Sequence, residues 1–233
     1  MNVRTKFSTK IKNKKINRFI IFGSVILFSS CEKHTDNTKI CSKEDSVQFV
    51  SDIPKIQGLS RTELMDYVKS SPTIETNQSS GIPFSTLDYD KIIAYDFKGD
   101  EELYDAPINE QGNFIPIIEK QQFLSQEQAD KILTALAKKS SYGEASAACF
   151  NPHLGLVFFK DNKKVNQISI CLDCNGSISE IDIPARRHRV FNKGTDDEYS
   201  FTGFTPQGKA AVAELCRAIN FYYKSADSTK AKK

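Results

Sequence analysis

From about residue 86 onward, hydrophobic and polar positions follow the two periods that distinguish strands from helices. Five stretches are rich in β-branched and aromatic residues and lie between turn-forming residues, which predicts β-strands. These strands are expected at 91–97, 114–118, 154–160, 165–172 and 177–183. From residue 31 to 85 the chain is mostly polar, and the run 70–83 is rich in helix- and strand-breaking residues. We therefore expect the compact domain to begin near Thr86.

Three segments carry the signals that begin a helix. Two have the spacing of a capping box, and the third has an N-cap threonine before a proline. The signals are Ser60 with Glu63, Ser125 with Gln128, and Thr205 with Pro206. Apolar residues then recur at helical spacing, including Cys216 in the last helix, where a small buried side chain is expected. The predicted helices are 60–70, 125–139 and 206–222.

These elements predict an α+β fold. It has an antiparallel sheet of about five strands, with the 125–139 and 206–222 helices packed on one face. The expected order along the chain is a signal peptide, a polar tether with a short helix near 60–70, the α+β domain and a disordered tail. Their bounds are 1–30, 31–85, 86–224 and 225–233.

The N-terminus has the three parts of an export signal. Seven Lys and Arg residues and no acids precede the apolar run FIIFGSVILF (19–28), which is shorter than the roughly 20 residues of a membrane span. Ser29 and Ser30 then lead directly to Cys31. This arrangement resembles a bacterial lipoprotein signal, which is cleaved before a cysteine that carries diacylglycerol. An uncleaved anchor and an ordinary signal peptide are the alternatives.

Cleavage before Cys31 changes the location and charge expected for the chain. Several acyl chains, palmitate among them, would anchor the cysteine to a membrane of the bacterial cell envelope, on its periplasmic or exposed side. The whole chain has a net charge of +3, but the mature chain keeps 25 Lys and Arg against 29 Asp and Glu. A mildly acidic chain is not expected to bind nucleic acid.

The stretch 149–174 combines a predicted hairpin with four side chains of chemical interest. The two strands are expected to turn at Asn162 and Lys163, which would put Val157, His153 and Cys149 on the face of Ile168, Ile170, Leu172 and Cys174. Cys171 would point the other way. A slip of one residue would reverse these faces.

Three interpretations of these four side chains stay open. The favoured one is a disulfide from Cys149 to Cys174 or to Cys171, since exported proteins keep their disulfides. The second is a zinc site formed by Cys149, His153, Cys171 and Cys174, whose C-x-x-C spacing can wrap one metal. The third is thiol–disulfide exchange at Cys171 and Cys174, although a redox C-x-x-C is expected at a helix N-terminus. For His153 alone, a structural role is favoured.

The segments ACFNPHLGLVFF and QISICLDCN resemble uncharacterised exported lipoproteins of Gram-negative bacteria. Those proteins carry a C-[FY]-x-P motif, an apolar strand and then I-C-x-x-C-N. LSQEQADKILTALAKKSSYG and GFTPQGKAAVAELC are similar to the segments that flank this motif, so the resemblance covers about residues 90–222. It implies no activity.

A basic cluster, Arg186 to Arg189, follows the last predicted strand. It could bind a phosphate or an anionic lipid headgroup, but a solvated loop is the favoured interpretation.

The chain has no catalytic triad, phosphate-binding loop or dinucleotide motif. We therefore expect a lipid-anchored envelope protein that acts by binding or as a structural component, without catalysis and without a cofactor. Another envelope protein could be its partner. Zinc binding or thiol redox chemistry at the cysteine cluster is the alternative.

Overall fold

The structure is a computed structural model, and it describes residues 58–100, 102–221 and 223. The signal peptide expected at 1–30, the lipidation site Cys31 and the tail 225–233 lie outside the described residues. Within the described part of the chain, no helix is long and apolar enough to cross a membrane.

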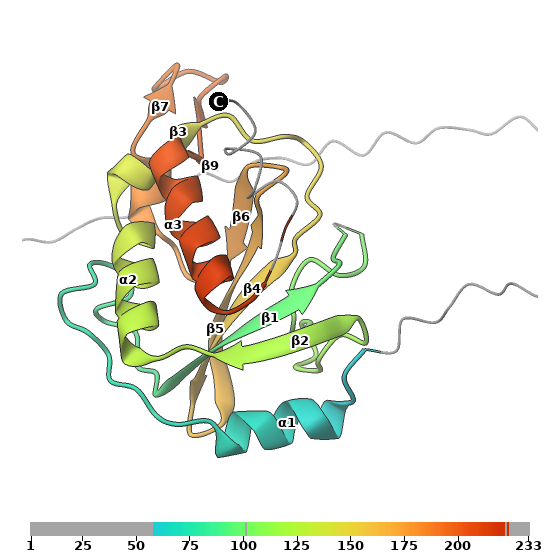
Figure 1. Ribbon diagram of the computed structural model, residues 1–233. Coiled ribbons are helices and arrows are strands. Elements are labelled where there is room, and N and C mark those ends of the chain that lie inside the picture. The colour runs from blue at the N-terminus through green and yellow to red at the C-terminus, as the bar shows by residue number, and fades with distance from the viewer. Residues whose placement is uncertain (1–57, 101, 222, 224–233) are drawn as a thin grey trace, which may run out of the picture. The chain divides into compact units, whose positions relative to one another are not determined.

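A five-stranded antiparallel sheet forms the centre of the fold (Figure 1). Its strands, in spatial order, are β2 (Ile118–Phe123), β1 (Lys91–Phe97), β4 (Leu154–Lys160), β5 (Lys163–Cys171) and β6 (Gly176–Ser179). The predicted α+β class and antiparallel sheet are confirmed. Four short strands that the sequence analysis missed make two further ribbons. They are β3 (Tyr142–Glu144) with β9 (Gly203–Phe204), and β7 (Val190–Phe191) with β8 (Tyr199–Ser200).

The second strand begins later than predicted. A strand was expected at 114–118, but β2 begins at Ile118, and Phe114 makes only an isolated bridge to Ile108. Pro116 explains the shift, because proline has no N–H to donate to a strand ladder. The last strand predicted, 177–183, is also shorter in the structure, where β6 ends at Ser179.

The hairpin of β4 and β5 turns one residue earlier than expected. Asp161 and Asn162 have φ angles of 49° and 63°, and Lys160 pairs with Lys163. Two central residues with positive φ make the type of tight turn whose twist matches that of its strands. The expected turn at Asn162 and Lys163 is therefore wrong.

The shift in register moves the strand residues to other faces. A bulge between Phe158 and Phe159 separates the turn from the regular ladder, in which Leu154 lies opposite Ile170. The predicted pairing, which placed Val157 on the face of Ile168 and Ile170, is therefore wrong. Val157 instead lies opposite Gln167.

The helices begin where their caps predicted. They are α1 (Arg61–Ser70), α2 (Gln126–Leu136) and α3 (Pro206–Ala218). Both capping boxes form, and the Thr205 hydroxyl accepts a hydrogen bond from the N–H of Gly208 at 3.2 Å. The last two helices end earlier than the expected residues 139 and 222. A short 3₁₀ turn, η1 (Lys139–Ser141), follows α2.

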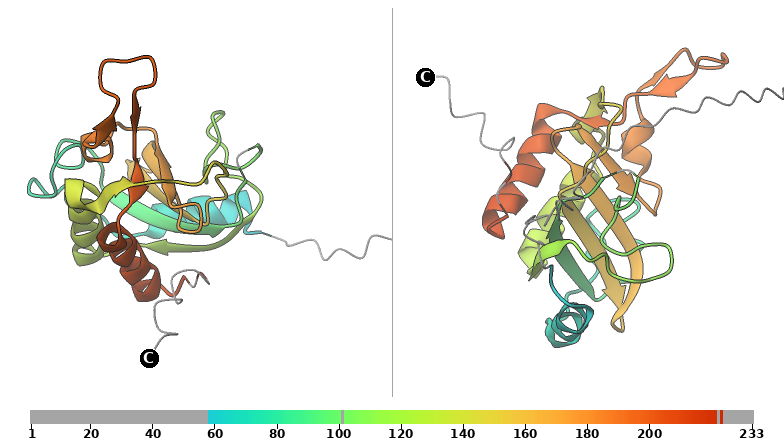
Figure 2. Two further views of the ribbon diagram at one scale, coloured as in Figure 1. Left: turned by 90° about the horizontal axis from the view of Figure 1, so that it is seen from above. Right: turned by 90° about the vertical axis from the view of Figure 1, so that its right-hand side faces the viewer.

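The two central strands are buried on both faces and so divide the core in two. One cluster joins alternate residues of β1, β4 and β5 to the buried faces of α2 and α3. It includes Ile92, Leu156, Phe158, Ile168, Leu133 and Val212. The other cluster joins the opposite faces of β1 and β4 to α1, and it includes Ile93, Tyr95, Val157, Phe159, Leu64 and Val68. Figure 2 also shows the β7–β8 ribbon standing away from the rest of the fold.

The compact domain begins earlier than Thr86. Phe84 is fully buried in the first cluster, and Leu64 and Val68 of α1 are buried in the second. Residues from about 58 onward therefore belong to the folded unit, and a tether that reaches residue 85 is too long. The helix near 60–70 is part of the core because it covers one face of β1.

Lys91, the first residue of β1, joins three parts of this fold. Its side chain is buried, and its ammonium group donates to the carbonyl oxygen of Val68 and to Oδ1 of Asn162, both at 2.8 Å. The carbonyl oxygen of Lys69 lies 3.4 Å away. Both carbonyls lie in the last turn of α1, where they have no partner within the helix and where a positive charge is favoured.

Replacing Lys91 with methionine should lower the free energy of unfolding by about 2–3 kcal/mol, because three acceptors lose their charged donor. Lys160→Met is the matched control. Lys160 pairs with Asp88 at 2.8 Å, but the Asp88 side chain is 79% exposed, so this substitution should cost well under about 1 kcal/mol. Urea denaturation followed by circular dichroism measures both. Equal losses would show that Lys91 does not have this role.

Candidate functional site

A disulfide joins Cys171 and Cys174 across the turn between β5 and β6. The Cα atoms are 5.3 Å apart, and both residues are buried. The backbone N–H of Cys174 donates to Sγ of Cys171 at 3.0 Å, and Asn175 completes the turn with a φ of 56°. The bridge therefore closes a local turn at the end of a strand.

The expected bridge from Cys149 to this turn differs from the structure. Cys149 is a free, exposed cysteine, although its neighbours do lie against the turn. The N–H of Ala147 donates to the carbonyl oxygen of Cys174 at 2.8 Å, and the N–H of Asn151 donates to Sγ of Cys174 at 3.3 Å. The sequence analysis thus placed the right segments together but paired the wrong sulfur atoms.

The difference in pairing changes what the disulfide can stabilise. In the loop-entropy model, closing the four-residue loop from Cys171 to Cys174 contributes about 2 kcal/mol. A bridge from Cys149 to Cys174 would close a much longer loop and contribute about 3.5 kcal/mol. The observed disulfide holds one turn in place and does not tie distant parts of the domain together.

The fourth candidate, His153, is held by its neighbours at the start of β4. Its ring stacks on Tyr223 with 5.6 Å between centroids, and Nε2 lies 3.7 Å from Oδ2 of Asp173. Among the residues that the structure describes, no three His, Cys, Asp or Glu side chains come together in a way that could hold a metal ion. The four predicted zinc ligands lie at one end of the hairpin but do not form a ligand set there.

A titratable cluster that the sequence analysis missed lies beside His153. The hydroxyl of Tyr223 donates to the carbonyl oxygen of His153 at 2.8 Å and lies 3.4 Å from Oδ1 of Asp96. Burial raises the pKa of Asp96, and Nζ of Lys120, 3.5 Å from its Oδ2, opposes this shift. The available signal was that Asp96 is the only acid inside the apolar strand KIIAYDF.

Cys216 adjoins this cluster and is buried, as predicted. Burial raises the pKa of its thiol to about 12, so the thiol is protonated at neutral pH. A protonated thiol is a poor nucleophile. The cluster therefore lacks an activated cysteine. Its groups contact one another where β1 and β4 meet and contribute to the packing there.

The basic cluster that follows β6 divides into side chains with different partners. Arg187 pairs with Asp182, with 2.5 Å between the nitrogen and the carboxylate oxygen. Arg189 donates to the carbonyl oxygen of Gly143 at 3.0 Å, and its guanidinium lies over the ring of Phe191, 5.2 Å from the centroid. These two arginines are thus engaged, one by an acid and one by an aromatic ring.

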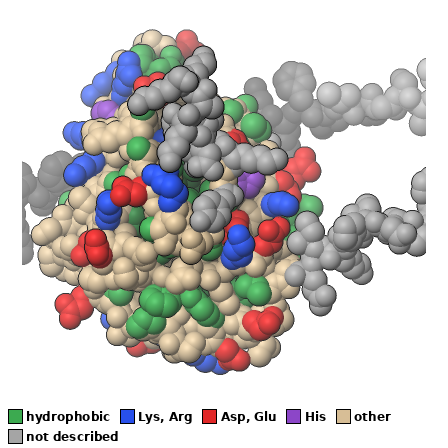
Figure 3. Space-filling model, viewed as in Figure 1, with side chains coloured by type: hydrophobic (Ala, Val, Ile, Leu, Met, Phe, Trp, Pro, Cys, Tyr) green, Lys and Arg blue, Asp and Glu red, His purple; other side chains and the backbone are tan. Residues whose placement is uncertain are grey.

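The other two basic residues lie on η2 (Pro184–Arg187) and directly after it. His188 places Nδ1 2.9 Å from the carbonyl oxygen of Ala185, and Arg186 donates from Nη2 to the carbonyl oxygen of Ser177. Figure 3 shows Lys and Arg side chains gathered at the upper left of the view, over the region where β7 lies in Figure 1.

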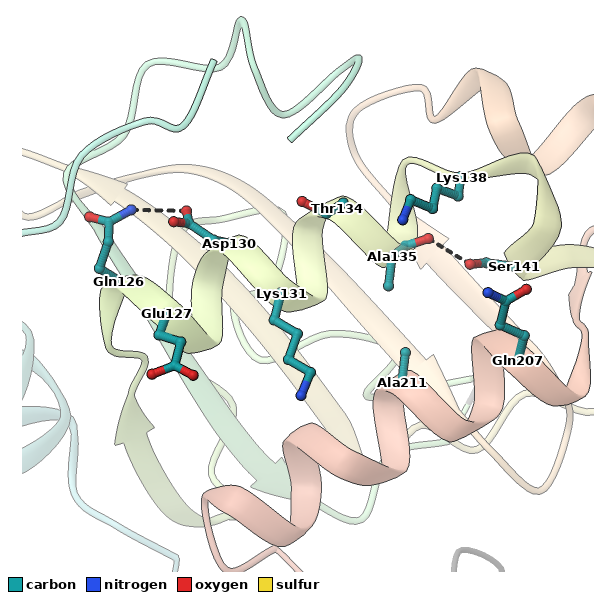
Figure 4. A pocket seen from close by; sticks show the side chains of 10 residues that line it. All are labelled: Gln126, Glu127, Asp130, Lys131, Thr134, Ala135, Lys138, Ser141, Gln207 and Ala211. Atoms are coloured by element: carbon teal, nitrogen blue, oxygen red, sulfur yellow. Dashed lines mark hydrogen bonds between the residues drawn. The ribbon is translucent and has the colours of Figure 1, made fainter. Parts of the chain in front are cut away.

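An open groove of about 760 Å³ runs between α2 and α3 (Figure 4). Its lining includes Gln126, Lys131 and Gln207, and Lys131 crosses toward α3 to pair with Glu214 at 2.5 Å. Gln126 donates to Asp130 at 2.9 Å. Lys131 and Gln126 are thus engaged by carboxylates of neighbouring side chains.

Comparison of the chain with family models, with curated proteins and with solved structures gives no match. The resemblance to exported lipoproteins therefore stays a prediction.

Native thiol mapping should distinguish the cysteines. An alkylating agent should label Cys149 in the folded protein and Cys216 only after unfolding. The peptide with Cys171 and Cys174 should be lighter by two hydrogen atoms until it is reduced, and the protein should hold no stoichiometric zinc. Peptide mass spectrometry and metal analysis measure these results. A peptide linked through Cys149, or one zinc with free thiols, would contradict the assignment.

Asp96→Asn should raise the free energy of unfolding at neutral pH. The pKa of this carboxyl is higher in the folded state than its ordinary value of 3.8, so protonation favours folding. This contribution to the free energy of unfolding is fully present below pH 3.8 and is lost as the pH rises through the folded pKa. The variant should therefore gain over the wild type as the pH rises from below 3.8 to 7. Asp88→Asn, at an exposed ion pair, is the control. Urea denaturation at several pH values measures this. A loss at neutral pH would show that the Lys120 pair dominates.

Proposed function

We propose that this protein is a lipid-anchored component of the bacterial cell envelope that acts without catalysis, by binding or as a structural element. Cys31 carries the lipid, and the folded domain lies on the periplasmic or exposed side of the membrane. The disulfide between Cys171 and Cys174 fixes the end of the central hairpin in this oxidising compartment.

The observation that carries this proposal is the position of the disulfide. It closes a buried turn at the end of β5, and cysteines in such a position are suited to stabilise a fold in a compartment where disulfides persist. Its two residues are 0% and 4% exposed. The charge of the mature chain is mildly acidic, which supports a protein or small-molecule partner over nucleic acid.

Thiol exchange and zinc binding are the alternatives at the same residues. Thiol exchange requires an attacking thiolate that is accessible and stabilised, usually at a helix N-terminus. Cys171 ends a strand and is buried, so it meets neither requirement. Zinc binding would require the bridge to open and His153 to leave Tyr223 and Asp173. Both alternatives therefore need a rearrangement that a structural disulfide does not.

Expression in a bacterial host with radiolabelled palmitate tests the anchor. The chain should incorporate label and sediment with membranes. Cys31→Ser should abolish labelling and leave the leader uncleaved, because cleavage requires the lipid-bearing cysteine, and intact-mass analysis measures the retained leader. Cys41→Ser, which changes the next cysteine along the chain, is the control and should keep both properties. Label that persists in Cys31→Ser would refute the lipoprotein assignment.

A further inference from the structure

Arg186 is the member of the basic cluster whose charge is least compensated. Its guanidinium donates from Nη2 to the carbonyl oxygen of Ser177, but Nε is buried and has no hydrogen-bond partner. In the described part of the chain, no carboxylate lies within ion-pair distance of Arg186. The nearby Asp182 pairs with Arg187 and favours the charge on Arg186 only from a greater distance. Charges that are largely removed from water are normally paired, so this half-buried cation lacks an expected partner.

A cavity of about 190 Å³ lies beside the half-buried side chain of Arg186. Arg186, Arg187, Asp182, Ser179 and Thr202 line it, together with two isoleucine side chains. The hydroxyl oxygen of Ser179 is also buried without a partner. The two residues that carry these unpaired atoms, one of them a cation, thus line one small cavity.

Size and charge restrict what this cavity can hold. The volume is below the roughly 300 Å³ at which pockets for drug-sized ligands begin, but it exceeds the space of one water molecule, about 30 Å³ in the liquid. Two arginines and one aspartate leave the lining with an excess of positive charge. Burial lowers the pKa of Arg186, an effect that an anion in the cavity would offset.

We propose that this cavity is a binding site for a phosphate group, held by the Arg186 guanidinium and the Ser179 hydroxyl. A guanidinium presents several N–H donors in one plane and matches the oxygen atoms of a phosphate, and a serine hydroxyl can donate to a third oxygen. Free phosphate and the phosphate of a lipid headgroup share this chemistry. The site does not depend on the lipid anchor.

Isothermal titration calorimetry of the full-length chain in detergent and chloride buffer, with inorganic phosphate as the probe, tests the site. The wild type should bind one phosphate saturably, and Arg186→Gln should weaken binding about tenfold or more, as expected for losing a charge-assisted hydrogen bond. Arg189→Gln is the matched control, because it removes the same charge from the same segment but lies outside the cavity lining. It should bind as the wild type does.

A second variant separates binding from folding. Ser179→Ala removes only one hydroxyl and should weaken phosphate binding several-fold while circular dichroism stays unchanged. This result decides the matter even if Arg186→Gln does not fold. The proposal is overturned if the wild type binds no phosphate, if Ser179→Ala binds as well as the wild type, or if Arg189→Gln is weakened as much as Arg186→Gln.

The source of the phosphate is distinguished by a second ligand. Glycerophosphoglycerol, the water-soluble headgroup of phosphatidylglycerol, carries a phosphate diester with two oxygen atoms free to accept. Competition between it and inorganic phosphate, lost in Ser179→Ala, would support a headgroup site. Binding of inorganic phosphate alone would support a site for the free anion.

Discussion

The burial of β1 and β4 on both faces is the constraint on which the rest of the fold depends. Two neighbouring strands that are apolar on both sides cannot leave either face in water, so the chain must supply a cover for each. Side chains of α2 and α3 share one core cluster with these strands, and those of α1 share the other. This requirement explains why residues 58–85 belong to the domain. Lys91 then fixes the distance between the cover and the sheet, because its ammonium group links the end of α1 to the turn of the central hairpin.

The features that could be predicted from sequence are those set by neighbours along the chain. The capping pairs at Ser60 and Ser125 place side chains within one helical turn, so spacing alone identifies them. The strands β1 and β4 were found because their apolar runs are local as well. The register of the hairpin was not found, because it depends on which two residues take positive φ. Asn162 was recognised as suited to such a turn, but Asp161, which is its partner, was not. A single step then reversed the faces of the whole strand.

The same division between local and distant contacts applies to the candidate site. The three cysteines and one histidine of the candidate site were correctly expected at one end of the hairpin. Which cysteines pair depended on the turn after β5, where Asn175 takes positive φ and brings Cys174 back to Cys171. The basic cluster shows a related limit. Four consecutive basic residues look equivalent in sequence, yet Arg187 is paired with an acid, Arg189 lies over an aromatic ring and Arg186 is half-buried against a backbone carbonyl. Only the fold assigns these different environments.

The disulfide turn and the Arg186 cavity are connected through one short strand. The turn that Cys171 and Cys174 close leads directly into β6, which pairs with β5 from Cys171 opposite Gly176 to Ile168 opposite Ser179. The carbonyl oxygen of Ser177, on the same strand, accepts the Arg186 hydrogen bond. A bridge that fixes where β6 begins therefore also fixes the position of the groups that face the guanidinium. β6 has β5 as its one neighbour in the five-stranded sheet, so its position depends on few ladder bonds. A covalent constraint at its start offsets that weakness, so the disulfide also helps to hold Ser179, at the end of this strand, in place beside the cavity.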